Sequence, residues 1–426
     1  MPIGIVRPQK RTEQWIMASS ASESATHETV ATMDAGRTRQ PAGAPLRVLH
    51  IFRYFRPDFT GEGLYLEKLA PLLDDLNIQA DVAVECTRSP AMNRPPAGIG
   101  RASFFGLGTG RVRRVPAVMT GWFLVNAFRY DVVHFHAFVD RIFLFHLIAR
   151  MSGCRIVQSA TLDDGLGSVL RGYRPIYRPL LLRLFRLIDA AVAISPRLHA
   201  DTRQVLPPRQ TWLIPQGVNP APDTSPADRS RWRAHWGFAA DDVVLLFVGG
   251  MCARKDVTFL VENHAALRPP ASGRVKLLLV GPQLEDGYLD ALRRLIAASA
   301  CHADIVLEGY MDDPSPAYGA ADVFVFASRG EGFGNVLIEA MSWGLPVVSR
   351  RLEQVTDHII DDGGTGFLFD TAAEYHAAAT RLIADPSRRL VMGRAACQTV
   401  RQRFDLPGIA HQYAQLYRLL TGKPDA

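Results

Sequence analysis

The sequence DVFVFASRGEGFGNVLIEAMSWGLPVVSR, residues 322–350, has the order of a buried strand, a glycine-rich turn, a helix and a second strand. The first apolar run ends at Ser328, and the turn continues through Gly334. Leu337 and Ala340 then fall on one side of a helix, before another apolar run begins. A strand, a helix and a strand in this order form the unit of a parallel sheet covered by helices, so the stretch predicts an α/β fold.

Strand-like apolar runs alternate with helix-length stretches along most of the chain. They occupy residues 47–52, 80–85, 131–136, 155–160 and 190–195 before a proline-rich stretch, and residues 242–250, 276–281, 304–309, 322–328 and 346–350 after it. A chain of 426 residues, 48% of them apolar, can bury two cores. We therefore predict two doubly wound domains, residues 46–214 and 215–400, with ligands beyond the carboxyl ends of the strands. Residues 1–45 lack periodicity and are predicted to be a disordered leader.

The composition limits the class of protein. The net charge of +6 comes mostly from arginine and could meet phosphates or an anionic membrane surface, or could reflect genome composition alone. No nucleic-acid partner is expected. The five cysteines are scattered without zinc spacing, which predicts no metal site and favours the cytoplasm. No segment offers the ~18 consecutive apolar residues of a spanning helix, so the protein is expected to be soluble or to lie on a membrane.

Glu331 and Glu339 are the residues of the turn and helix with the clearest chemical use. The glycines let backbone N–H groups approach a ligand, and a helix start favours a diphosphate. A carboxylate accepts two hydrogen bonds from vicinal hydroxyls, so one glutamate could hold a sugar and the other a ribose. Taken singly, Glu331 could equally be a helix-start charge and Glu339 a solvated carboxylate.

The whole string resembles the E-x7-E signature of the retaining glycosyltransferases of family 4. The family pattern is S-x-x-E-G-F-G-x-x-x-x-E-A-M-x-x-G-x-P-V-V, and every fixed position is present from Ser328 through Val348. The resemblance implies the GT-B architecture, in which two Rossmann-like domains face each other across a cleft. Residues 401–426 resemble the terminal helix that returns to pack on the N-terminal domain.

The resemblance also implies roles for single residues in this cleft. Glu331 would contact the transferred sugar and Glu339 the ribose, while Lys255 and Arg254 would meet the diphosphate; Glu331, Lys255 and Arg254 are the expected catalytic residues. The other expected donor contacts are Gly61, Glu62 and Gly63 in the first domain and Gly281, Tyr310, Met311, Gly332, Phe333, Gly334 and Asn335 in the second.

The acceptor side departs from the family pattern. A histidine common in relatives is replaced by TLDDG, so Thr161 or Asp163 occupies that region. His136 is a third acceptor-side residue, expected to face the opposite side of its strand from His134. Gly250 stands where relatives often have an arginine, and the expected G-G-x-x-E reads RRLEQVTD, with Glu353 or Asp357 as the substitute.

By this resemblance the protein is a retaining transferase, in which the acceptor attacks the sugar on the face from which the leaving group departs. No D-x-D triplet is present, so we predict metal-independent chemistry without a cofactor, the nucleotide sugar being a substrate. The expected acceptor is a glycan, free or lipid-linked, in bacterial polysaccharide assembly. The expected location is the cytoplasm or the inner face of the plasma membrane.

Two other functions share the two-domain outline. An inactive GT-B relative could bind a sugar nucleotide as a partner protein, and a GT-B epimerase could act on a sugar nucleotide. An NAD oxidoreductase is disfavoured because no G-x-G-x-x-G lies at a strand-to-helix turn.

One helix raises the question of membrane contact. A helix opening at Pro179 would place Leu180, Leu184, Leu187 and Ile188 on one apolar face. That face is expected to pack on the core, with contact to a membrane interface as the alternative.

Overall fold

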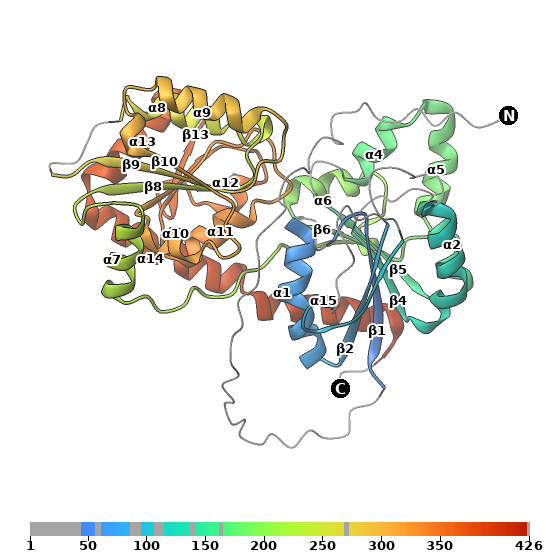
Figure 1. Ribbon diagram of the computed structural model, residues 1–426. Helices are drawn as coiled ribbons and strands as arrows, with labels where there is room; N and C mark the ends of the chain where they lie inside the picture. Colours follow the sequence, from blue (N-terminus) through green and yellow to red (C-terminus); the bar gives the residue numbers. More distant parts are fainter. Residues whose placement is uncertain are drawn as a thin grey trace, which may run out of the picture.

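The computed structural model describes residues 44–55, 61–85, 95–105, 115–136, 142–161, 165–267 and 272–423. Within these ranges the chain forms two α/β domains that lie side by side, each built on one parallel sheet (Figure 1). The predicted fold class is confirmed. Most of the expected leader at residues 1–45 lies outside the described residues, as does Asp163.

The first domain contains a seven-stranded sheet in the order β3-β2-β1-β4-β5-β6-β7. Its strands are β1 (Leu46–Phe52), β2 (Ile78–Val84), β3 (Ile99–Phe104), β4 (Val132–Phe135), β5 (Arg155–Ala160), β6 (Ala190–Ala193) and β7 (Thr211–Leu213). The strand order reverses between β1 and β4, where ligands bind in such sheets. The sequence did not predict β3 or β7, because β3 is an edge strand with only its first residue buried and β7 is only three residues long.

The second domain contains a six-stranded sheet in the order β10-β9-β8-β11-β12-β13, which reverses between β8 and β11. Its strands are β8 (Val243–Val248), β9 (Val275–Val280), β10 (Ile305–Gly309), β11 (Val323–Phe326), β12 (Val347–Arg350) and β13 (Gly366–Phe369). Its helices are α7 (Pro226–His235), α8 (Val257–His264), α9 (Tyr288–Ala298), α10 (Ser315–Ala320), α11 (Asn335–Ser342), α12 (Thr356–Ile359), α13 (Ala372–Ala384) and α14 (Pro386–Arg403).

Helices cover both faces of the first sheet. One face packs on α1 (Gly61–Asp75) and α15 (Leu406–Thr421), through a cluster that includes Val48 and Val132. The other packs on α2 (Val115–Asn126), α3 (Ile142–Met151) and α5 (Arg178–Phe185), through a cluster that includes Leu49 and Val133. Successive strand residues point to opposite faces, so each strand supplies both clusters. The remaining helices, α4 (Leu166–Gly172) and α6 (Pro196–Thr202), follow β5 and β6.

The last helix, α15, belongs to the core of the first domain although it follows the second in sequence. Asp405 caps its start by accepting a hydrogen bond from the Gly408 backbone N–H (3.0 Å), and Pro407 lies in its first turn. Gly422 ends it in a left-handed conformation, with φ of 70°. Figure 1 shows α15 beside α1, and Tyr413 and Tyr417 are buried between them and the sheet.

The expected apolar face of the helix opening at Pro179 was right in part. Leu184, Leu187 and Ile188 pack on the core of the first domain as expected. Leu180 is 57% exposed, and helix α5, which ends at Phe185, buries Leu181 and Phe185. Within the described ranges, no helix is both long enough and apolar enough to cross a bilayer.

Candidate active site

Glu331 lies where the turn after β11 meets the loop after β8. Its Oε1 is 2.7 Å from Lys255 Nζ, 2.9 Å from Arg254 Nη1 and 2.6 Å from Ser328 Oγ. Lys255 and Arg254 share one 3-10 turn, η4 (Ala253–Lys255), and β8 pairs with β11. The reversal in strand order therefore brings the three residues expected to be catalytic into one group, although their catalytic roles stay a prediction.

The Glu331 carboxylate is buried but ionised at neutral pH. Burial alone would raise its pKa, but the charges of Lys255 and Arg254, with hydrogen bonds from Lys255 and Ser328, outweigh this effect and lower the pKa. Both cations are themselves mostly shielded, with side chains 12% and 27% exposed. The site therefore holds positive charge in a poorly solvated position, where it acts strongly on a nearby phosphate.

Two glycines show how closely backbone can approach at this edge of the sheet. A Cβ on Gly281 would lie 1.9 Å from the carbonyl oxygen of Gly249, so the loops after β8 and β9 leave no room for a side chain. Gly334 precedes α11 with φ of 109°, a conformation that favours glycine. Gly332, Phe333 and Gly334 are buried in this turn, and Asn335 begins the helix.

Glu339, on α11, connects the two domains. Its Oε1 pairs with Lys68 Nζ of α1 at 3.0 Å, and its Oε2 accepts a hydrogen bond from the Tyr318 hydroxyl at 3.1 Å. Burial, followed by the nearby Glu339, raises the pKa of Tyr318 well above its usual value, so the hydroxyl stays a donor. Glu339, which is expected to bind the ribose, thus has a partner on each of its carboxylate oxygens.

The expected base contacts lie at the end of β10. Tyr310 is 46% exposed and its hydroxyl donates to Asp312 at 3.0 Å, while Met311 packs partly against the core of the second domain. Both follow the carboxyl end of a strand, as Gly281 does.

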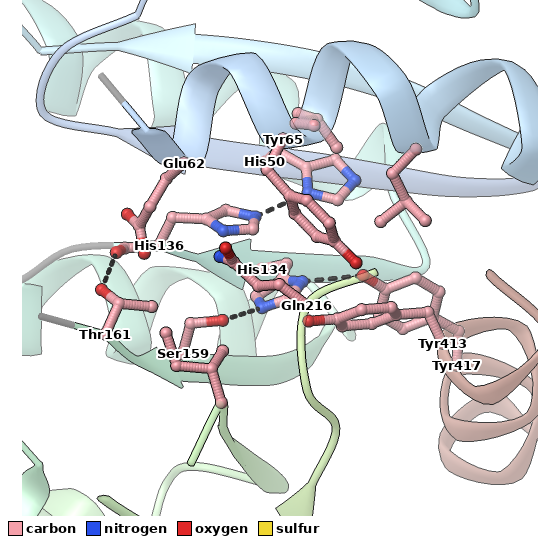
Figure 2. A pocket seen from close by; sticks show the side chains of 13 residues that line it. His50, Glu62, Tyr65, His134, His136, Ser159, Thr161, Gln216, Tyr413 and Tyr417 are labelled. Carbon is pink, nitrogen blue, oxygen red and sulfur yellow. Dashed lines mark hydrogen bonds between the residues drawn. The ribbon is translucent and has the colours of Figure 1, made fainter. Parts of the chain in front are cut away.

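Of the expected contacts of the first domain, Glu62 lines a small cavity between α1, α15 and the sheet (Figure 2). Gly61, Glu62 and Gly63 form the first turn of α1. Burial raises the pKa of Glu62 to about 8, against a hydrogen bond with Thr161 that lowers it, and its Oε1 is buried without a partner. Thr161 also donates to the His136 carbonyl oxygen at 3.3 Å. Glu62 and Thr161 are therefore neighbours, and the Glu62 carboxyl is largely protonated at neutral pH.

His134 and His136 point to the same side, which corrects the expectation that they face opposite sides. Their rings stack at 4.2 Å, because residues two apart on a strand share a face. His50 of β1 joins them, with its Nδ1 2.9 Å from His136 Nε2. Burial lowers the pKa of all three, to about 3 for His50, so the rings are uncharged.

The three histidines could each offer a nitrogen, all within 4.8 Å of one another, as metal ligands do. Both nitrogens of His134 are already 2.7 Å from hydroxyl groups, those of Tyr417 and Ser159. We interpret this cluster as a hydrogen-bonded network.

Sequence reasoning missed several residues that meet at the cleft. Arg197, at the start of α6, donates to the Glu331 carbonyl oxygen across the domains at 3.0 Å. Lys68 and His50 were missed because nothing in their local sequence shows which distant segment they meet. Glu353 and Asp357 are both exposed, and neither has a hydrogen bond to a described site residue. Gln354 instead has φ of 57°, at the place where the family pattern has glycines.

Two family models match the chain over its two domains. One, described as "Glycosyltransferase Family 4", matches residues 59–222, and the other, "Glycosyl transferases group 1", matches residues 242–385. The chain belongs to the family 4 glycosyltransferases. Its activity is accordingly that of a glycosyltransferase.

Curated relatives carry several acceptor specificities. The D-inositol 3-phosphate glycosyltransferase of Geodermatophilus obscurus is 28% identical, over 82% of this chain and 85% of that protein. The protein of that name from Kineococcus radiotolerans is 29% identical, but over 55% of this chain and only 58% of its own length. The lipopolysaccharide core glycosyltransferase LpsE of Rhizobium meliloti is 32% identical over 45% of this chain and 54% of that protein.

Solved structures share the two-domain fold. Anabaena HepE, in complex with UDP and glucose, has a TM-score of 0.70 at 20% identity and covers 87% of this chain and 99% of its own. WaaG, a glycosyltransferase involved in lipopolysaccharide biosynthesis, has a TM-score of 0.66 at 17% identity, over 88% of this chain and 100% of its own. At these identities the likeness establishes the GT-B fold alone.

Proposed function

We propose that this glycosyltransferase is retaining and metal-independent and uses a nucleotide sugar as donor. We further propose that its acceptor is a lipid-linked glycan in bacterial surface polysaccharide assembly, met at the inner face of the plasma membrane. The observation that carries the first proposal is the group formed by Glu331, Lys255 and Arg254, with Glu339 one helix turn beyond it. Relatives named as glycosyltransferases of lipopolysaccharide core biosynthesis and of capsular polysaccharide biosynthesis support the second.

In the proposed step, the bond between the sugar and the donor phosphate breaks while the acceptor oxygen bonds to the same face of the sugar. The departing phosphate oxygen takes the proton of the acceptor hydroxyl. Lys255 and Arg254 would stabilise the negative charge that grows on the phosphate, and Glu331 would hold the sugar hydroxyls. Positioning and charge stabilisation of this kind need neither a protein nucleophile nor a metal ion.

A thermal-shift screen of nucleotides and nucleotide sugars tests the donor. A donor at ~100 times its Kd stabilises the native state by about 2.7 kcal/mol, and UDP-glucose is the first compound to test because HepE has been solved with it. Glu331→Gln should keep a nucleotide-induced shift, relative to its own melting temperature, but lose turnover.

Four outcomes would contradict the proposal. Donor binding without turnover by the wild-type protein would indicate an inactive relative, and conversion of the donor sugar without acceptor would indicate an epimerase. A product with the opposite anomeric configuration, read by NMR, would exclude retention. Loss of activity after chelation, with recovery on adding manganese, would exclude the metal-independent mechanism.

A further inference from the structure

The outer helices of the first domain carry most of the exposed apolar side chains in the described part of the chain. Ten of the fifteen exposed large apolar residues there lie on α2, α3, α5 and the short turns η1 (Ala127–Arg129) and η2 (Pro175–Tyr177). They are Val118, Leu124, Val125, Phe128, Leu144, Leu147, Met151, Ile176, Leu180 and Leu182. Clusters of this kind mark interaction sites rather than ordinary surface.

These helices form one continuous layer. Phe145 of α3 contacts Phe123 of α2, with ring centroids 5.3 Å apart, and Phe143 of α3 contacts Phe185 of α5 at 5.4 Å. Helix α3 therefore lies between α2 and α5, and all three bury their inner sides in the same cluster against the sheet. Figure 1 shows α2 and α5 on the side of the first domain away from the second domain. We call this outer surface the α2–α3–α5 face.

The charge of the α2–α3–α5 face has one sign. Residues 115–130, 142–151 and 166–188 contain seven arginines and neither aspartate nor glutamate. Asp189, the next acid along the chain, already pairs with Arg150 and Arg155 at 3.0 and 3.4 Å. A surface that is both apolar and exclusively basic is complementary to an anionic bilayer, where arginine meets phosphate and apolar side chains enter the headgroup boundary.

Three arginines of this face are free to meet such a surface. Arg174, Arg183 and Arg186 are exposed, and none has an ion-pair partner among the residues that the structure describes. The exposed Ile176 and Leu180 lie between Arg174 and Arg183 along the chain.

We propose that the α2–α3–α5 face docks on an anionic phospholipid bilayer. The proposal rests on the proposed function only in that the bilayer would carry the lipid-linked acceptor. Docking by this face would leave the second domain away from the membrane and free to exchange donor with the solution.

Vesicle flotation tests the surface. The purified protein should float with vesicles of phosphatidylcholine and phosphatidylglycerol, float less with phosphatidylcholine alone, and dissociate as salt is raised. Arg183→Gln/Arg186→Gln should lower the partition coefficient roughly 30-fold, at about 1 kcal/mol per arginine. Ile176→Ser/Leu180→Ser should lower it roughly 10-fold.

Matched variants in the second domain are the controls. Arg293→Gln/Arg294→Gln on α9 removes the same charge, and Leu390→Ser/Val391→Ser on α14 removes two apolar side chains that are 55% and 66% exposed. Both should float like the wild type. Equal loss in the controls, equal flotation of the face variants, or no flotation of the wild type would overturn the proposal.

A second copy of the chain is the other occupant to exclude. If Ile176→Ser/Leu180→Ser dissociates a dimer in sedimentation but leaves flotation unchanged, the face is a subunit interface. Donor turnover measured without vesicles separates this test from the test of the proposed function. All four double variants should retain donor turnover, including those that no longer float. Flotation without turnover would leave the docking face standing and refute the enzyme mechanism.

Discussion

Replacing Glu331 by glutamine should cost more stability than removing either of its cationic partners. Glu331→Gln removes the carboxylate that Lys255 and Arg254 share, and the Lys255 side chain is only 12% exposed. Breaking a buried pair in this way costs about 3–5 kcal/mol. Lys255→Met leaves Glu331 its bonds to Arg254 and Ser328, so we expect the loss of one charge-assisted hydrogen bond, about 1.5–3 kcal/mol.

A double-mutant cycle by urea unfolding at neutral pH measures this coupling. Lys255→Met/Glu331→Gln removes both members of the pair, so its cost should fall short of the sum of the single variants by at least ~1 kcal/mol. A coupling below ~0.5 kcal/mol would refute the electrostatic reasoning. So would a greater loss for Lys255→Met than for Glu331→Gln.

The second domain offers a matched control at the opposite edge of its sheet. Asp304 lies between Lys276 and Arg274, at 2.8 and 2.7 Å, and its partner Lys276 is also 12% exposed. Asp304 precedes β10 and Lys276 opens β9, so this group lies at the amino ends of the strands, away from the cleft. Asp304→Asn and Lys276→Met should lose similar stability but retain donor turnover. If Asp304→Asn and Lys276→Met also lose turnover, the loss of turnover in Glu331→Gln is explained by its lower stability alone.

Three further predictions follow from single residues. Because the pKa of Glu62 is raised from 4.5 to about 8, the native state loses stability as the pH rises between these two values. Glu62→Gln should therefore leave the free energy of unfolding unchanged below that window and raise it by on the order of 3 kcal/mol at pH 8, as measured by urea unfolding. Gln354 has φ of 57°, so Gln354→Val should lower the free energy of unfolding by about 1–2 kcal/mol and Gln354→Gly should not, as thermal melts would show. Lys68→Met should tighten nucleotide binding up to ~5-fold in calorimetry, because a ribose that binds Glu339, as the family resemblance implies, would no longer displace a half-exposed ion pair; weaker binding would mean that Lys68 helps to hold the nucleotide.

Most strands that the sequence predicted are buried on both faces, with the edge strand β10 as an exception. A run such as residues 243–248 is apolar throughout, because helices cover both sides of a parallel sheet. β3 was missed because an edge strand need not be apolar, and only the first residue of its sequence IGRASF is buried. Leu180 was assigned wrongly to the core face because RPLLLRLF has leucines on every side, so periodicity could not decide that Leu181 is buried in its place.

The candidate site could be predicted only as far as single segments determine it. Residues 328–339 come from one turn and helix, and their mutual placement follows from local geometry. The approach of Lys255 follows from β8 and β11 being neighbours at the strand reversal, which a doubly wound fold implies. Arg197 and Lys68 could not be predicted, because their contacts depend on how the two domains meet.

The two glutamates differ in what holds them, and this difference bears on how a donor would enter. The carboxylate of Glu331 is held by Lys255 and Arg254 of its own domain, although its backbone carbonyl oxygen accepts a hydrogen bond from Arg197 of the first domain. The carboxylate of Glu339 is held by Lys68 of the other domain, so this side-chain pairing depends on domain position. A ligand that takes the place of Lys68 on Glu339 would therefore be linked directly to the domain arrangement, whereas one that contacts the Glu331 carboxylate would meet side chains of the second domain alone. If the ribose binds Glu339, as the family resemblance implies, the nucleotide end of the donor would be the part that breaks a side-chain ion pair between the domains.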